Sequence, residues 1–93
     1  MIAVPYERLT EAGQVKSAPG RLFWLIGSNI SNDAKYFILN DATSGTESEV
    51  AKFLIPGNQT KVWTFNPPMS LPTGIRIGTI ESDKVIVTAG YDA

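Results

Sequence analysis

The 93 residues of this chain carry 8 lysines and arginines against 9 aspartates and glutamates, and they include no histidine and no cysteine. The length supports one small domain, and the near-neutral charge argues against nucleic acid and anionic membrane as partners, because both attract basic surfaces. The missing residue types remove the commonest general base, the thiolate nucleophile and the commonest metal ligands. We therefore expect no enzyme activity, no cofactor and no metal.

The N-terminal segment 1–13 is predicted to be an extended arm. It has a mixed composition and offers apolar side chains at Val4, Tyr6 and Leu9. A helical turn of this length would not be stable alone in water, so a floppy terminus and a strap that packs on a neighbouring subunit both remain open. The segment lacks the features of a secretory signal, and no stretch approaches the ~20 apolar residues that span a bilayer, which predicts synthesis in a cytoplasm.

From residue 14 onward the chain reads as consecutive short strands in a single domain, 14–93. Runs rich in aromatic and β-branched residues alternate with Gly, Pro, Asn, Asp and Ser, which is the pattern of strands joined by turns. The predicted strands are 13–16, 21–26, 35–40, 50–55, 60–65, 75–80 and 84–88. About seven short strands without a convincing helix predict an all-β fold, a compact antiparallel β-sandwich or jelly-roll-like barrel with an extended N-terminal arm.

Two segments are predicted to lie outside the strands. Residues 41–48 form the most polar stretch of the chain and are expected to be a long exposed loop. Residues 66–69 are expected to leave the sheet, because Pro67 and Pro68 cannot donate hydrogen bonds to a central ladder. Acidic side chains of the loops do not match the spacing of a calcium-binding loop, so we interpret Asp33, Asp41, Glu47 and Glu49 as solvated acids rather than a metal site.

Strands 21–26 and 35–40 carry more apolar side chains than a sheet with one buried face needs. Strict alternation places Leu22, Trp24 and Ile26 on one face of the first strand, opposite Phe23 and Leu25, and Tyr36 and Ile38 on one face of the second, opposite Phe37 and Leu39. A chain this short cannot build a three-layer core, so we expect the second face to meet the arm, another subunit or a large partner. The candidate interface residues are Val4, Tyr6, Leu9, Phe23, Leu25, Phe37, Leu39 and Tyr91.

The aromatic residues admit a second interpretation. Trp24, Tyr36, Trp63 and Phe65 would suit a sugar-stacking platform, although their positions inside strand patterns favour ordinary core packing. Tyr6 and Tyr91 are less constrained by the strand patterns, and either would suit an interface anchor. A small carbohydrate-binding or host-attachment module of a virion is therefore the alternative function, with Trp63 or Tyr91 as the exposed aromatic.

The hydrophobic and turn pattern over residues 20–80 resembles small all-β virion proteins of tailed bacteriophages. The resemblance is carried by GRLF at 20–23, AKYFILND at 34–41, FLIPG at 53–57, FNPP at 65–68 and GIRIGT at 74–79. It implies a jelly-roll-like capsid cement or decoration protein, a head auxiliary protein located on the capsid surface. Such proteins typically form homotrimers over junctions between major capsid protein subunits. Segments 1–13 and 41–48 would then be the bridging parts.

Overall fold

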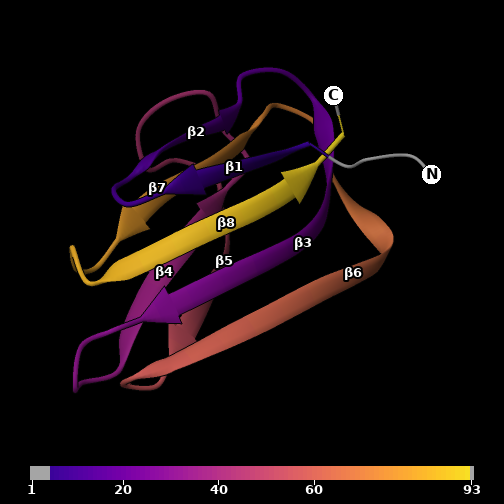
Figure 1. The fold of residues 1–93 in the computed structure, drawn as a ribbon. Coiled ribbons are helices and arrows are strands. Elements are labelled where there is room, and N and C mark those ends of the chain that lie inside the picture. Colours follow the sequence, from indigo (N-terminus) through magenta and orange to yellow (C-terminus); the bar gives the residue numbers. More distant parts are fainter. Residues whose placement is uncertain (1–4, 93) are drawn as a thin grey trace.

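The computed structural model describes residues 5–92, and over this range the chain consists of strands joined by turns, with no helix (Figure 1). Short runs of β-branched and aromatic residues form the strands, and Gly, Pro, Asn, Asp and Ser separate them. The strands are β1 (Tyr6–Leu9), β2 (Gly13–Lys16), β3 (Gly20–Asn29), β4 (Lys35–Asn40), β5 (Glu49–Ile55), β6 (Gln59–Leu71), β7 (Ile75–Ile80) and β8 (Val85–Tyr91).

The strands form two four-stranded antiparallel sheets that pack as a sandwich. Sheet A has the order β1-β8-β3-β6, and sheet B has the order β2-β7-β4-β5. The first strand pairs with the last, the second with the seventh, the third with the sixth and the fourth with the fifth. This nested pairing is that of an eight-stranded jelly roll. The predicted antiparallel sandwich is confirmed, with eight strands in place of about seven.

The additional strand comes from the segment predicted to be an arm. Tyr6–Leu9 pairs with β8 of the same chain, and the backbone N–H of Tyr91 donates to the carbonyl of Pro5 at 3.0 Å. Leu9 packs against the core from this strand. The described part of the arm therefore belongs to the sandwich itself, and Val4 lies outside the described residues.

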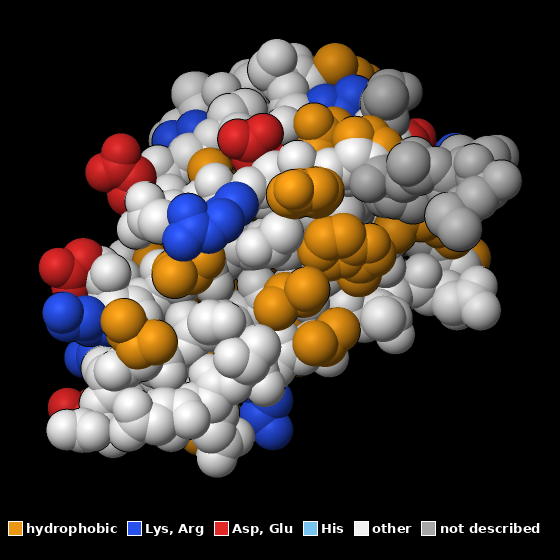
Figure 2. Space-filling model, in the orientation of Figure 1, with side chains coloured by type: hydrophobic (Ala, Val, Ile, Leu, Met, Phe, Trp, Pro, Cys, Tyr) orange, Lys and Arg blue, Asp and Glu red, His pale blue; other side chains and the backbone are white. Residues whose placement is uncertain are grey.

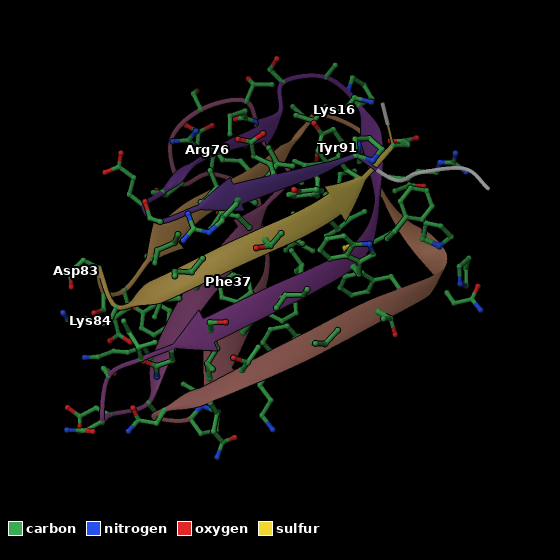
Figure 3. The ribbon with its side chains drawn as sticks, in the orientation of Figure 1. Lys16, Phe37, Arg76, Asp83, Lys84 and Tyr91 are labelled. Atoms are coloured by element: carbon green, nitrogen blue, oxygen red, sulfur yellow. The ribbon has the colours of Figure 1, made fainter. Side chains whose placement is uncertain are left out.

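The core lies between the sheets, where the inward-facing side chains of both sheets meet. Three aromatic rings form its centre: Phe37 and Phe53 of sheet B stack at 5.0 Å between centroids, and Trp63 of sheet A meets them edge-on at 5.6 and 4.9 Å. Figure 3 shows Phe37 between the two layers. A Cβ at Gly27 would come within 2.6 Å of Ile55, so the glycine allows sheet B to approach β3 closely.

Two polar groups fasten the ends of the sandwich. The buried Asn29 donates from its amide to the carbonyls of Asp33 at 2.8 Å and Ile55 at 3.0 Å, which links β3 to the next turn and to sheet B. At the opposite end, Asp92 accepts from the backbone N–H of Arg21 at 2.7 Å and lies 3.5 Å from Lys16 Nζ. Arg21 also bonds Asp92 through its Nε at 3.0 Å, so one carboxylate holds segments of β2, β3 and β8 together.

The prediction that residues 66–69 leave the sheet is wrong. Strand β6 continues to Leu71, with Trp24 opposite Thr64 and Leu22 opposite Met69. The register shifts between these two pairs, so residues 65–68 lie opposite Phe23 alone and bulge from the ladder. Because β6 is an edge strand, its prolines deprive no second neighbour of hydrogen bonds.

Candidate functional site

The described residues hold no cluster suited to metal chemistry. No three acidic side chains of residues 5–92 lie close enough to bind a metal ion. The loop acid Asp41 is instead a structural acceptor, because its Oδ1 takes hydrogen bonds from the backbone N–H groups of Thr73 at 2.8 Å and Gly74 at 3.2 Å. The described part of the chain also has no helix of the length and apolarity that crossing a membrane requires.

The surface that stands out is the outer face of sheet A. Strand pairing arranges its side chains in three rows across the sheet, because directly paired residues share a face. The rows are Tyr6, Gly90, Trp24 and Thr64; then Arg8, Thr88, Ile26 and Val62; then Ile86, Ser28 and Thr60. Arg8 is the one charged side chain in these rows. The hydrogen-bonded hydroxyls of Ser28 and Thr60, 3.0 Å apart, confirm the shared face.

The apolar members of these rows define what we call the sheet A patch. Tyr6 is 65% exposed and Val62 is 61% exposed, and the other members are half-buried. Figure 2 shows hydrophobic side chains gathered across the middle of this face, with backbone and other uncharged side chains between them. The patch consists of Tyr6, Trp24, Ile26, Val62 and Ile86.

Trp24 is positioned by a glycine on the neighbouring strand. Gly90 stands directly opposite Trp24, and a Cβ added there would collide with the indole ring. The ring therefore lies across the backbone of β8, in the row that ends with Tyr6 on β1. An aromatic side chain that covers a glycine on the neighbouring strand compensates for the side chain that the glycine lacks.

The outer face of sheet B differs in charge and in cover. Lys52 lies 4.1 Å from the ring centroid of Tyr36, which places a cation over this face. The loop between β4 and β5 reaches back toward β7, because Arg76 Nε donates to the carbonyl of Gly45 at 2.8 Å and Asn40 donates to the carbonyl of Glu47 at 2.9 Å. Figure 1 shows no described segment in front of sheet A. The segment expected to be a long exposed loop is exposed at residues 43–48 and also partly covers sheet B, whereas sheet A stays open over residues 5–92.

The structure corrects the predicted interface residues. Leu25, Phe37 and Leu39 are fully buried between the sheets, so their side chains cannot contact a partner of the folded sandwich. Leu9 and Tyr91 are half-buried and pack against the core, and Phe23 is half-buried within a bulge beside Arg21. Among the predicted residues that the structure describes, Tyr6 alone lies in the sheet A patch.

Trp24 and Ile26 were missed because a bulge reverses the alternation of β3, and Val62 and Ile86 lie on β6 and β8, which were not among the strands predicted to have a second apolar face. Leu22 pairs with Tyr91 and Trp24 pairs with Gly90, so Phe23 is an extra residue on β3. A bulge of this kind places two successive residues on the same side of the strand. Leu22 and Leu25 consequently both point inward, although strict alternation assigns them to opposite faces. The apolar surplus was visible in the sequence, but the face that carries it was not.

The predicted sugar platform does not form as a unit. Trp63 belongs to the aromatic centre of the core, and Tyr36 lies on sheet B beneath Lys52. Trp24 is the one tryptophan on the outer face of sheet A, since the sequence contains two. In comparisons with known proteins, no family model, curated protein or solved structure matches the chain. A function for this chain must therefore be inferred from its surface.

Proposed function

We propose that this protein is a non-enzymatic structural component of a tailed-phage virion, a capsid decoration protein that associates with itself and with the major capsid protein. The observation that carries the proposal is the sheet A patch. It is apolar and open over the described residues, and the rows that carry it include one charged side chain, Arg8. Contiguous exposed apolar surface of this kind marks interaction sites, because burying it in a complex is favourable.

Two further features support the proposal. Jelly rolls occur in viral capsid domains and in lectins, although a fold alone does not assign a function. The resemblance of residues 20–80 to phage head proteins favours the first of these classes. A protein whose task is to bridge subunits needs a rigid core and an adhesive surface, and the aromatic centre and the sheet A patch would serve these two roles.

The proposal is tested by solution mass and by binding to heads assembled from the major capsid protein of the same phage. We expect an oligomer by light scattering at micromolar concentration and co-sedimentation with the heads. The double variant Tyr6→Ser, Ile86→Thr should weaken head binding roughly tenfold or more, because burial of each large apolar side chain contributes on the order of 1.5–3 kcal/mol. Leu54→Thr is the matched control, since Leu54 is exposed to 61% on sheet B.

A monomer that does not sediment with heads would refute the proposal. Equal loss of binding in the double variant and the Leu54→Thr control would show that the sheet A patch is not the surface used. The resemblance predicts a trimer, and the measured mass tests that number directly.

The second candidate function is carbohydrate binding, which the placement of Trp24 over Gly90, in the row that ends with Tyr6, favours. Trp63→Phe leaves Trp24 as the single indole of the chain, so its fluorescence would report directly on the outer face. A monomer whose Trp24 emission shifts or quenches with added glycans would favour this function over capsid decoration.

A further inference from the structure

We propose that the free edge of β6, over residues 59–65, pairs antiparallel with the same segment of a second copy around a two-fold axis at Val62. The two A sheets would thereby join into one continuous sheet. This inference rests on the proposed self-association and deepens it by naming the contact that produces it.

The first part of β6 is a regular strand with one open side. Sheet A ends at β6, and among residues 5–92 no strand pairs with its other edge. From Asn29 opposite Gln59 to Trp24 opposite Thr64, six consecutive pairs follow one another without a register shift. Such an edge presents a row of backbone N–H and C=O groups that can pair with another chain. The register irregularity and the two prolines begin only beyond Thr64.

The charges along the strand allow this pairing. With the axis at Val62, Thr60 of each copy lies opposite Thr64 of the other, and Lys61 lies opposite Trp63. Thr–Thr pairs directly across a ladder are favourable, and a lysine beside an indole avoids like-charge contact and allows a cation–π interaction. An axis at Lys61 would instead place two lysines against each other, which destabilises a strand pair.

The other three edges of the sandwich are poorer templates. Strands β1 and β2 have four residues each, and β2 also contains a register shift. Strand β5 has seven residues, Glu49–Ile55, with Lys52 at its centre. Two-fold pairing about the middle of β5 would therefore bring two lysines into contact. Val62 occupies the equivalent central place in residues 59–65 of β6 and is 61% exposed.

The pairing would also extend the sheet A patch. Val62 stands in the same row as Ile26 and Thr88, so joining two copies at β6 places two patches side by side on one surface. The contact is isologous, since the same segment serves both partners, and an isologous contact produces assemblies with an even number of copies. A capsid partner would then meet a doubled apolar surface rather than a single patch.

Disulfide cross-linking tests the contact, because the natural chain has no cysteine. Val62→Cys places a thiol on the proposed axis, where side chains directly opposite each other approach within disulfide range. Leu54→Cys is the matched control, equally exposed at 61% but on the outer edge strand of sheet B. Each variant is oxidised at ~10 μM with diamide, followed by non-reducing electrophoresis, and wild-type and Val62→Asp masses are measured by light scattering.

We expect Val62→Cys to form a covalent dimer roughly tenfold or more faster than Leu54→Cys, because pairing holds the two thiols at a high effective concentration. Val62→Asp should convert the wild-type oligomer to monomer, since two carboxylates would face each other. The β6 contact would be overturned if wild type were an oligomer but both cysteine variants cross-linked equally, or if the Val62→Asp variant were still an oligomer. Either result would leave the proposed self-association standing. A wild-type monomer would overturn both. If wild type were a trimer, its copies would associate through a heterologous contact, which would exclude the proposed two-fold axis at Val62.

Discussion

Replacing Phe37 by alanine tests whether this side chain belongs to the core or to an interface. Phe37 is fully buried and contacts the rings of Phe53 and Trp63. Truncating a buried phenylalanine costs about 3–5 kcal/mol in transfer free energy and residual cavity. A domain of this size has a total stability of about 5–14 kcal/mol, at ~0.05–0.15 kcal/mol per residue. Phe37→Ala should therefore remove a large fraction of the free energy of unfolding.

The neighbouring residue provides the control. Tyr36 is half-buried on the outer face of sheet B, beneath Lys52, so Tyr36→Ala should cost about 1 kcal/mol or less through the lost cation–π contact. Urea unfolding followed by tryptophan fluorescence measures both variants, and Trp63 reports from beside Phe37. If the two substitutions lowered the free energy of unfolding equally, the assignment of alternate faces of β4 would be refuted.

Two further predictions concern the ion pairs of Asp92 with Arg21 and Lys16, which we call the Asp92 clasp, and Gly90, which lies beneath Trp24. The backbone N–H and guanidinium of Arg21, with Lys16, lower the pKa of Asp92 from 3.8 to about 2. Because the pKa is lower in the folded state than in the unfolded state, the ionised Asp92 stabilises the fold above about pH 4, and this stabilisation is lost as pH falls toward 2. Thermal unfolding across that range should show a weaker pH dependence in Asp92→Asn than in wild type, and identical profiles would contradict the clasp. Gly90→Ala should destabilise by about 1–3 kcal/mol and shift Trp24 emission, because the new Cβ collides with the indole. Gly13→Ala, whose Cβ would meet only Leu9 side-chain carbons at 3.3 Å and more distant atoms, should change that emission little.

The all-β fold could be predicted from the sequence, because turn residues and alternating apolar side chains mark strands locally. Turn residues delimit strands in nearly every place where the sequence predicted them, and the inward side chains Val85, Val87 and Ala89 alternate cleanly enough to be read directly. What the sequence could not reveal is pairing between distant segments. Tyr6–Leu9 becomes a strand because β8 offers it an edge, and four residues with this composition carry no such signal by themselves.

The sequence predicted a second apolar face but not which residues form it. An excess of apolar side chains in 21–26 correctly indicated a second apolar face. The identity of that face depends on one inserted residue, Phe23, which shifts the phase of everything before it relative to Leu25. A bulge arises from the register of two flanking strands, so no pattern within β3 marks its position. The same limitation applied to β6, where the prolines were correctly read as breaks in the ladder but wrongly as the end of the strand.

The two outer faces of the sandwich differ in how much of each is covered, and this difference affects how copies can associate. If both faces were equally open, their opposite orientations would let an A-to-B contact repeat from copy to copy and form a filament rather than a closed assembly. The loop between β4 and β5 works against this, because its backbone is tied to Arg76 and Asn40 over part of sheet B. Lys52 adds a charge to the same face. Because the loop covers part of sheet B and no described segment covers sheet A, a repeating A-to-B contact is disfavoured, and the self-association proposed for sheet A would form closed assemblies.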